Sequence, residues 1–283
     1  MLEIRDRRLE FLCARSNLQF PTSNSPLTFH PIRLTFVAMR YLIFAMVLLV
    51  ACAAESRTIT IYAASNLQAA FTEIGAAFEK ESGARVIFNF GATGQLAQQI
   101  AQGAPVDVFA SADRATVDDL AARDLIARDS VANYARGQIV VYTRGDALSL
   151  NDLARSDIKR IAIANPERAP YGRAAREALH NANLLATIES KIIYAENIQQ
   201  TQQYADTGAV DAAIIARSLA INAQGQWREI PQNLYAPIEQ AIGVVAASKH
   251  QRDARAFIAF VLSDAGRAVL AKYGYTMPNN QSQ

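Results

Sequence analysis

The chain has 283 residues, enough for one large domain or two of medium size. Hydrophobic residues make up 51% and charged residues 19%, a composition that excludes a disordered or wholly membrane-embedded chain. The formal net charge is +2 with both signs interspersed, so charge predicts neither nucleic acid nor an anionic membrane surface as a partner.

The first element along the chain is an uninterrupted apolar run at residues 41–51, which follows Met39 and Arg40. It is shorter than the roughly 20 residues needed to span a bilayer. One positive residue before it and small residues after it are typical of a secretory signal, so we predict a signal peptide at 39–54; the alternative is a buried core element. Residues 1–38 show no sustained period, and we interpret them as an extension upstream of the true start.

The chain has two cysteines, Cys13 and Cys52, so the mature domain holds at most one cysteine and no internal disulfide. The sequence Leu-Val-Ala-Cys at 49–52 resembles a bacterial lipobox, in which Cys52 is lipidated. Ordinary cleavage after Ala53 or Ala54 fits the small residues equally well. We therefore expect an exported protein of the periplasm, either free or lipid-anchored through Cys52.

Strands and helices alternate after the signal, which is typical of an α/β domain with a largely parallel sheet. Apolar β-rich runs predict the strands, and apolar residues at helical spacing predict the helices. Gly83 is placed to end the first helix, and Gly274 the last. The predicted strands are 58–64, 85–90, 106–110, 137–143, 160–164, 191–195, 209–215 and 241–247, and the predicted helices are 66–82, 95–102, 115–123, 173–183, 199–206, 252–262 and 265–273.

Two series of alternating strands and helices, joined in mid-chain and followed by a helical tail, predict two lobes with a cleft between them. In open α/β sheets, ligands bind beyond the carboxyl ends of the strands. The strand-to-helix turns are therefore the places to look for a site. Four of them carry the relevant chemistry: 64–66, 91–94, 165–172 and 196–198.

Two of these turns, 64–66 and 91–94, contain no charged residue. A helix N-terminus offers unpaired N–H groups and a partial positive charge. The hydroxyls of Ser65 and Thr93 add donors that can rotate. A cage of hydrogen-bond donors suits a permanently ionised dianion, which has only acceptor oxygens. A protonated phosphate also needs an acceptor for its own proton. A carboxylate in the cage would repel any of these anions. The turns predict a neutral cage for a fully deprotonated oxyanion.

Each of these residues alone also fits a purely structural role. Ser65 and Thr93 are the residue types expected as plain helix N-caps. Tyr171 fits a packed aromatic beside a glycine-containing turn, and Glu196 followed by Asn197 fits the start of a helix.

Seven short segments, taken in order, carry a family resemblance. The segments are YAASNL at 62–67, FGATG at 90–94, GAPVDVF at 103–109, AIANP at 162–166, APYG at 169–172, ENIQQT at 196–201 and KYGY at 272–275. With these segments, the chain resembles the molybdate-binding periplasmic proteins of ABC transporters from residue 58 to residue 278.

The resemblance implies a type II periplasmic-binding-protein fold, in which two α/β lobes close on a ligand cleft about a hinge. The first lobe would comprise 57–136 and 241–283, and the second 137–240. The implied function is capture of molybdate, and of tungstate, for delivery to the membrane permease of an ABC importer. Molybdenum would be present only within the bound oxyanion, with no direct protein–metal ligand, and no cofactor is expected.

The resemblance also implies which residues hold the oxyanion. Ser65 and Thr93 would donate hydroxyl hydrogen bonds, and Asn66 would donate through its backbone or its side chain. Tyr171 would donate its backbone N–H beside Gly172. The backbone N–H of Ile198 would complete the set.

The chain departs from one branch of the family. That branch has a tyrosine whose phenol donates from a strand end in the second lobe, whereas this chain has Ala216 there, followed by Arg217. The departure leaves the donor count and the preference for molybdate over sulfate open. Arg217 is interpreted as a solvated surface residue; the alternative is a guard at the cleft mouth.

Other functions fit the sequence less well. Nucleophilic catalysis needs a Ser or Cys beside a His, and the mature part has only His180 and His250, both in positions typical of surface residues, so we predict no enzyme. A regulator would carry a helix-turn-helix where this chain has its signal-like run. The alternative to molybdate capture is that the same fold binds sulfate, thiosulfate or a phosphonate.

We expect a monomer, because a hinge-closing receptor presents both lobes to its transporter.

Overall fold

The computed structural model describes residues 57–277. These residues belong to a single compact unit of the chain. The predicted extension at 1–38, the signal peptide at 39–54 and Cys52 lie outside the described residues, and so do residues 278–283.

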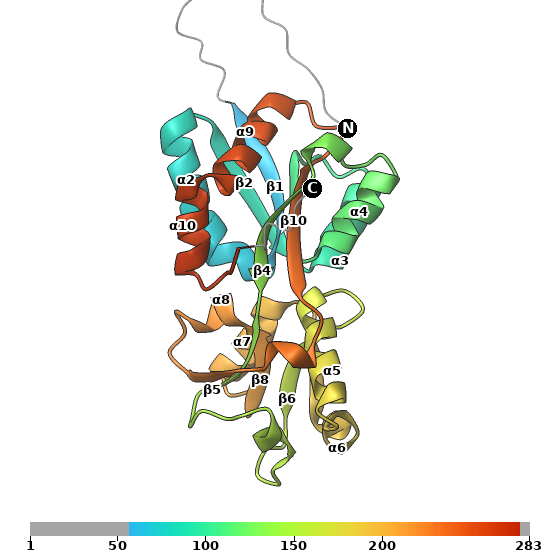
Figure 1. Ribbon diagram of the computed structural model, residues 1–283, viewed down its shortest axis with the longest axis vertical. Coiled ribbons are helices and arrows are strands. Elements are labelled where there is room, and N and C mark those ends of the chain that lie inside the picture. Colours follow the sequence, from blue (N-terminus) through green and yellow to red (C-terminus); the bar gives the residue numbers. More distant parts are fainter. Residues whose placement is uncertain (1–56, 278–283) are drawn as a thin grey trace, which may run out of the picture. The chain divides into compact units, whose positions relative to one another are not determined.

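The first of two five-stranded sheets has the order β2-β1-β3-β10-β4. β2, β1 and β3 are parallel, whereas β10 runs antiparallel to both β3 and β4. Figure 1 shows α2, α9 and α10 together on one side of this sheet, and α3 and α4 on the other. The elements are β1 (Thr58–Ala64), α2 (Gln68–Ser82), β2 (Arg85–Gly91), α3 (Thr93–Ala101), β3 (Val108–Ser111), α4 (Arg114–Ala122), β4 (Ala132–Gly137), β10 (Ile238–Val244), α9 (Gln251–Leu262) and α10 (Asp264–Lys272).

The second sheet has the order β7-β6-β8-β5-β9. β7, β6 and β8 are parallel, and β5 runs antiparallel to β8 and β9, so the two sheets repeat one topology. The elements are β5 (Ile139–Thr143), β6 (Ile161–Ala164), α5 (Pro170–Asn181), α6 (Leu185–Ile188), β7 (Ile192–Ala195), α7 (Ile198–Asp206), β8 (Ala212–Ala216), α8 (Arg217–Ala220) and β9 (Gln226–Glu229). Short 3-10 helices lie at Ser65–Leu67, Arg128–Ser130, Asn151–Ala154, Glu189–Lys191 and Gln232–Leu234.

The local sequence explains the elements that border the site. β1 lies between β2 and β3, and its Ile59 and Ile61 are both buried. α2 buries its apolar stripe against the sheet and ends at Gly83, whose φ of 70° lies in the left-handed region that favours glycine. The chain therefore reverses after each parallel strand and brings the helix N-termini to the same edge of the sheet.

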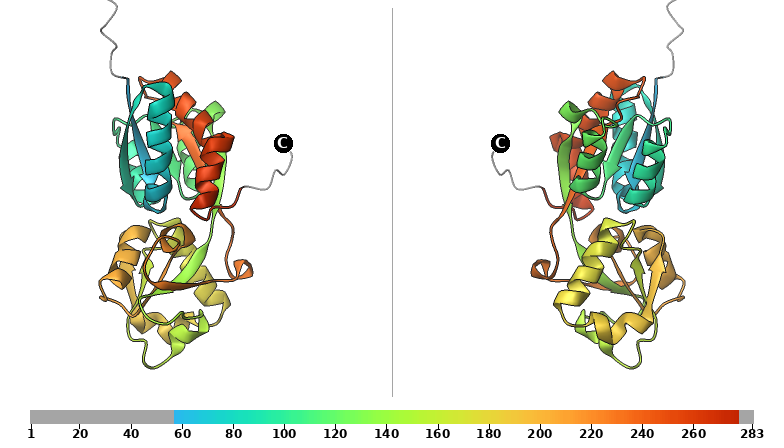
Figure 2. Two further views of the ribbon diagram at one scale, coloured as in Figure 1. Left: turned by 90° about the vertical axis from the view of Figure 1, so that its left-hand side faces the viewer. Right: turned by 90° about the vertical axis from the view of Figure 1, so that its right-hand side faces the viewer.

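β4 and β10 connect the two sheets. Figures 1 and 2 show this antiparallel pair running from the first sheet towards the second. The chain passes into the second sheet at Gln138, between β4 and β5, and returns just before Ile238. The predicted lobe boundaries lie at 136/137 and 240/241, and as domain boundaries they stay a prediction. Below, the first lobe means the elements on the first sheet, and the second lobe those on the second.

The predicted α/β class is confirmed, with differences in single elements. The expected strand at 137–143 corresponds to β5, which begins two residues later at Ile139, because Gly137 is the last residue of β4. β4 and β9 were not predicted from the sequence, because neither has the apolar alternation that signals a strand. β4 is held by its pairing with β10, and the polar β9 is an edge strand.

Candidate functional site

One small cavity lies where helix N-termini from both lobes meet. Its volume is about 10 Å³, comparable to the roughly 10–15 Å³ needed for one water molecule. The structure brings all five sequence-predicted residues together around it. The lining residues are Ala64, Ser65, Asn66, Gly91, Ala92, Thr93, Ala112, Ala169, Pro170, Tyr171 and Ile198.

The first lobe contributes hydroxyl groups. Ser65 follows β1 directly and is 3% exposed, and its hydroxyl has no hydrogen-bond partner among residues 57–277. Thr93 begins α3, and its Oγ accepts a hydrogen bond of 3.1 Å from the Ala112 N–H. A hydroxyl that accepts one bond can still donate its own proton. Both hydroxyls are therefore available as donors to a group in the cavity.

The side chain of Asn66 is committed to a buried network and does not serve as a free donor. Its Nδ2 donates to Gln240 Oε1 at 3.0 Å and to the Tyr275 hydroxyl at 2.9 Å, and lies 3.4 Å from the Tyr171 hydroxyl. Its Oδ1 is buried without a partner in the described part of the chain. Such an orphaned atom costs on the order of 1–3 kcal/mol, so the other contacts must hold the amide in place. Of the two donors predicted for Asn66, the backbone N–H is the one left for a ligand.

The second lobe contributes backbone N–H groups. Tyr171 lies in the first turn of α5, and Ile198 is the first residue of α7. First-turn N–H groups have no intrahelical partner, and neither of these two finds another partner among the described residues. Asn197 caps α7 by accepting from the N–H groups of Gln199 and Gln200, so it leaves the Ile198 N–H free.

A network of tyrosines beneath the cavity joins the two lobes. Gln240 Nε2 donates to the Tyr171 hydroxyl at 3.0 Å, and the Tyr134 hydroxyl donates to Gln240 Oε1 at 2.9 Å. Burial raises the pKa of the Tyr134 and Tyr171 phenols well above the ordinary value, and raises that of Tyr275 as well. The phenols therefore stay protonated at neutral pH and hold the turns by neutral hydrogen bonds.

Sequence reasoning missed this network, because Asn66 and Gln240 lie 174 positions apart. The signal available in the sequence was the KYGY motif that contains Tyr275.

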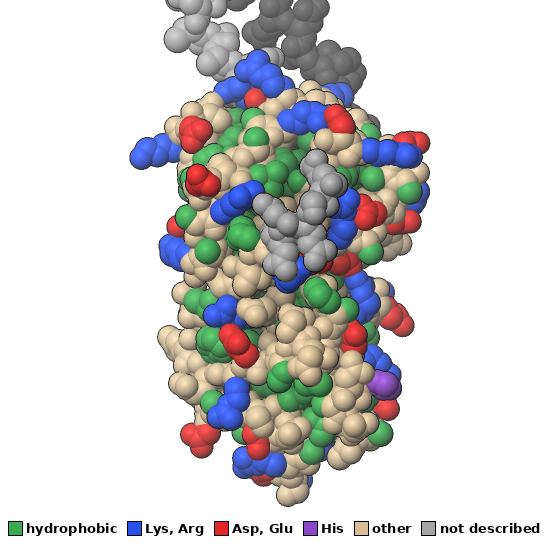
Figure 3. Space-filling model, in the orientation of Figure 1, with side chains coloured by type: hydrophobic (Ala, Val, Ile, Leu, Met, Phe, Trp, Pro, Cys, Tyr) green, Lys and Arg blue, Asp and Glu red, His purple; other side chains and the backbone are tan. Residues whose placement is uncertain are grey.

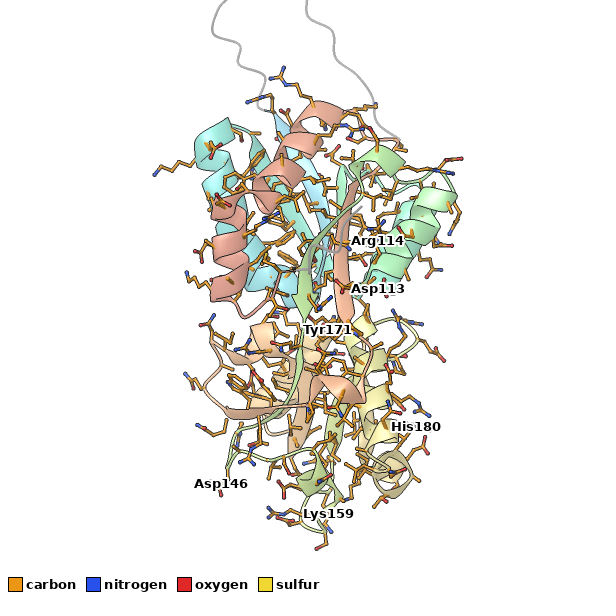
Figure 4. All side chains as sticks on the ribbon, viewed as in Figure 1. Asp113, Arg114, Asp146, Lys159, Tyr171 and His180 are labelled. Atoms are coloured by element: carbon orange, nitrogen blue, oxygen red, sulfur yellow. The ribbon has the colours of Figure 1, made fainter. Side chains whose placement is uncertain are left out.

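Charge enters the site only at its border. None of the residues that line the cavity is Lys, Arg, Asp or Glu. Asp113, next to the lining residue Ala112, pairs with Arg173 of α5 and so links the two lobes. Figure 4 shows Asp113 and Tyr171 at the adjoining ends of the two lobes, and His180 farther along α5. Chemically, the arrangement is a set of hydrogen-bond donors without a formal charge of either sign.

Arg217 fits neither of the roles expected from the sequence. Its side chain is 28% exposed and does not line the cavity. Its Nη1 donates to Gln138 Oε1 at 3.0 Å and to the Gly274 carbonyl at 3.3 Å, and its Nε lies 3.1 Å from a Glu229 oxygen. The arginine therefore connects the second lobe to the segment that follows α10.

Other features of the described residues do not form a comparable site. A larger pocket of about 570 Å³ lies in the second lobe beside Tyr142, Arg144 and Asp206, where no set of helix N-termini converges. Residues 57–277 contain no cluster of three or more His, Cys, Asp or Glu placed to hold a metal ion. In the same residues no helix is long and apolar enough to cross a membrane. Figure 3 shows positive and negative side chains interspersed over one face.

Comparison with known proteins gives a consistent result. The family model described as Bacterial extracellular solute-binding protein matches residues 59–276. The Molybdate-binding protein ModA of Rhodobacter capsulatus is 31% identical over 236 residues, which cover 82% of this chain and 93% of that protein. The Putative ABC transporter substrate-binding lipoprotein YvgL of Bacillus subtilis is 32% identical over 229 residues, covering 77% of this chain and 86% of that protein.

A solved structure agrees with the sequence relatives. The periplasmic molybdate-binding protein of Azotobacter vinelandii matches with a TM-score of 0.75 and 26% identity, covering 78% of this chain and all of that one. The likeness confirms the predicted type II periplasmic-binding-protein fold.

Proposed function

Because the chain belongs to the bacterial extracellular solute-binding protein family, we propose that it captures molybdate outside the cytoplasm and delivers it to an ABC importer. The family is one of solute-binding proteins and not of enzymes. In this proposal the ligands of the oxyanion are the hydroxyls of Ser65 and Thr93 and the backbone N–H groups of Asn66, Tyr171 and Ile198.

One observation carries the proposal: five donors from both lobes surround a single small cavity that no charged side chain lines. A fully deprotonated oxyanion has only acceptor oxygens, so a shell of donors satisfies it completely. Helix N-termini favour negative charge without a formal cation. A protonated phosphate would have only the Ser65 and Thr93 hydroxyl oxygens as acceptors for its own proton, because the other groups of the shell are backbone N–H donors.

The preference among tetrahedral anions should follow from the length of their bonds. Sulfate is also a tetrahedral dianion, but its bonds are shorter than those of molybdate. A rigid shell that fits the larger ion leaves gaps around the smaller one, and each bond lost to a charged oxygen forfeits about 1.5–3 kcal/mol. Tungstate is nearly the size of molybdate, and we propose that it binds as well.

The wider role follows from the same relatives. We propose that the protein acts in the periplasm as a monomer, needs no cofactor, and passes its ligand to a membrane permease. A relative named as a lipoprotein supports anchoring through Cys52, with ordinary cleavage after Ala53 or Ala54 as the alternative. Mass spectrometry of the natural protein tests this step: a lipidated Cys52 at the N-terminus supports the anchor, and a free N-terminus at Ala54 or Glu55 contradicts it.

Isothermal calorimetry tests the binding step. Residues 55–283 form one compact unit and can be titrated separately with molybdate, tungstate, sulfate and phosphate. We expect one-to-one binding of molybdate and tungstate, with sulfate at least 10-fold weaker because about 1.4 kcal/mol or more of bonding is lost. If none of the four anions binds, the proposal is wrong.

A pair of serine variants provides the control. Ser65→Ala removes a hydroxyl that has no partner in the described residues, so its loss should weaken molybdate binding by about 1.5–3 kcal/mol. Ser156→Ala removes an exposed hydroxyl of the second lobe and should leave the Kd unchanged. Equal Kd values for the two variants would place the anion elsewhere.

A further inference from the structure

The KYGY motif at residues 272–275 has a structural position that its family resemblance does not explain. α10 ends at Lys272, and Gly274, with a φ of 76°, turns the chain back toward the site. Beyond the turn, Thr276 pairs through its backbone with Arg136 of β4. The segment therefore crosses the first lobe beside the strands that connect the two sheets.

Tyr275 places its hydroxyl against Asn66. The hydroxyl donates to the Asn66 carbonyl at 2.8 Å and accepts from Asn66 Nδ2 at 2.9 Å. Tyr275 is 4% exposed and Asn66 is 1% exposed, so water does not compete for these two bonds. One phenol thus fixes both the carbonyl and the side chain of a single residue.

Asn66 lines the cavity, and its backbone N–H is the one donor of this residue that has no partner among the described residues. A residue whose carbonyl and amide are both held has little freedom to rotate its N–H away. We propose that Tyr275 is a positioning residue for the oxyanion site, which aims the Asn66 N–H at the ligand without touching the ligand. The inference rests on the proposed function.

The same turn also receives contacts from the second lobe. Ser218 of α8 donates to the Asn66 carbonyl at 3.2 Å, so this oxygen accepts from both lobes. Gly274 lies against Ile221, where a Cβ would come within 2.3 Å of the Ile221 Cδ1, and its carbonyl accepts from Arg217. Tyr275 therefore holds the Asn66 turn at a point that contacts the second lobe directly.

Two tyrosines of the motif supply a matched pair of variants. Tyr275→Phe removes the hydroxyl and its two bonds to Asn66, while keeping the ring. Tyr273→Phe removes a hydroxyl from the same segment, but that hydroxyl bonds Glu73 on α2, away from the cavity. We expect the Kd for molybdate to rise about 10-fold in Tyr275→Phe, as for the loss of two hydrogen bonds, and to change less than about twofold in Tyr273→Phe. An unchanged Kd in Tyr275→Phe would overturn the inference.

A ligand-free measurement separates positioning from general stability. The backbone and carboxamide ¹⁵N–¹H signals of Asn66 should move in Tyr275→Phe and stay in place in Tyr273→Phe. If wild-type protein does not bind molybdate, the proposed function fails, and these signals alone decide the inference. Unmoved Asn66 signals in Tyr275→Phe would then contradict it.

Ser218→Ala is a second test, in case Tyr275→Phe does not fold. It removes one donor from the same carbonyl and leaves Tyr275 in place. Because one bond is lost instead of two, we expect the Kd for molybdate to rise about two- to fivefold. The amide signal of Leu67 should also shift, because the Leu67 N–H and the Asn66 carbonyl belong to the same peptide group. A Kd and a signal that both match wild type would count against positioning through this carbonyl.

Discussion

The two lobes share a sheet topology and yet present different chemistry to the cavity. Each sheet places three parallel strands beside an antiparallel pair. The first lobe offers rotatable hydroxyls at Ser65 and Thr93 in addition to the backbone N–H of Asn66, whereas the second offers the backbone N–H groups of Tyr171 and Ile198. A hydroxyl depends on the identity of its side chain, but a backbone donor depends only on the path of the chain.

This difference means that substitutions should act by different routes in the two lobes. In the first lobe, losing a side chain loses a donor. In the second lobe, a donor is lost only when the backbone moves, so the sensitive residues are those that set the position of a helix. The three predictions below test this contrast, in order of decreasing effect.

Gly172→Ala should have the largest effect, because it moves the backbone of the second lobe. A Cβ at this position would lie 2.1 Å from the Ala164 carbonyl oxygen at the end of β6. A main-chain atom cannot give way as a flexible side chain can, so the first turn of α5 must shift and carry the Tyr171 N–H with it. We expect molybdate binding to weaken by about 3 kcal/mol, on the order of 100-fold, by calorimetry.

Gly145→Ala is the control for this prediction. A Cβ there would meet nothing within 4 Å, so the Kd should stay at the wild-type value. A Gly172→Ala variant that binds as tightly as wild type would show that the position of α5 does not matter to the ligand.

The sequence was sufficient for the parts of the site that are local. Ser65 and Thr93 follow strands marked by apolar runs, and Gly172 follows a proline that opens a helix. Strand-to-helix turns in such a chain lie at one edge of the sheet. The α/β class and four of the turns around the cavity could therefore be predicted from the sequence, whereas the turn after β3 that carries Ala112 was not predicted.

What the sequence did not reveal depends on contacts between distant residues. β4 carries the polar residues Asn133 and Arg136, and it is a strand because β10 pairs with it. In the same way, Tyr134 and Gln240 are buried together although 106 positions separate them. No periodicity records which distant polar groups will meet, so the network that fixes the Asn66 side chain required the structure.

The ion pair between Asp113 and Arg173 should have an intermediate effect, because it joins the lobes beside the cavity. Asp113→Asn removes the charge but keeps a residue able to cap α4. Partly exposed ion pairs are worth about 0.2–1 kcal/mol, so we expect molybdate to dissociate up to about fivefold faster in stopped-flow measurements. Added salt should raise the dissociation rate of wild type more than that of the variant.

Asp118→Asn is the matched control, since Asp118 pairs with Arg114 within α4 and does not reach the second lobe. Its dissociation rate should equal that of wild type. If Asp113→Asn also dissociates at the wild-type rate, the ion pair does not hold the lobes together.

Ile198→Val should have the smallest effect on binding, although Ile198 lines the cavity. The substitution keeps the backbone N–H and the start of α7, so the Kd for molybdate should change less than about twofold. The side chain is buried at 3% exposure, and removing one methyl group should lower the free energy of unfolding by about 0.5–1.5 kcal/mol in urea titrations. Ser65→Ala should do the opposite, weakening binding with little change in the stability of the ligand-free protein. If Ile198→Val weakened binding as much as Ser65→Ala, the second lobe would be contacting the anion through side chains, and the contrast between the lobes would be wrong.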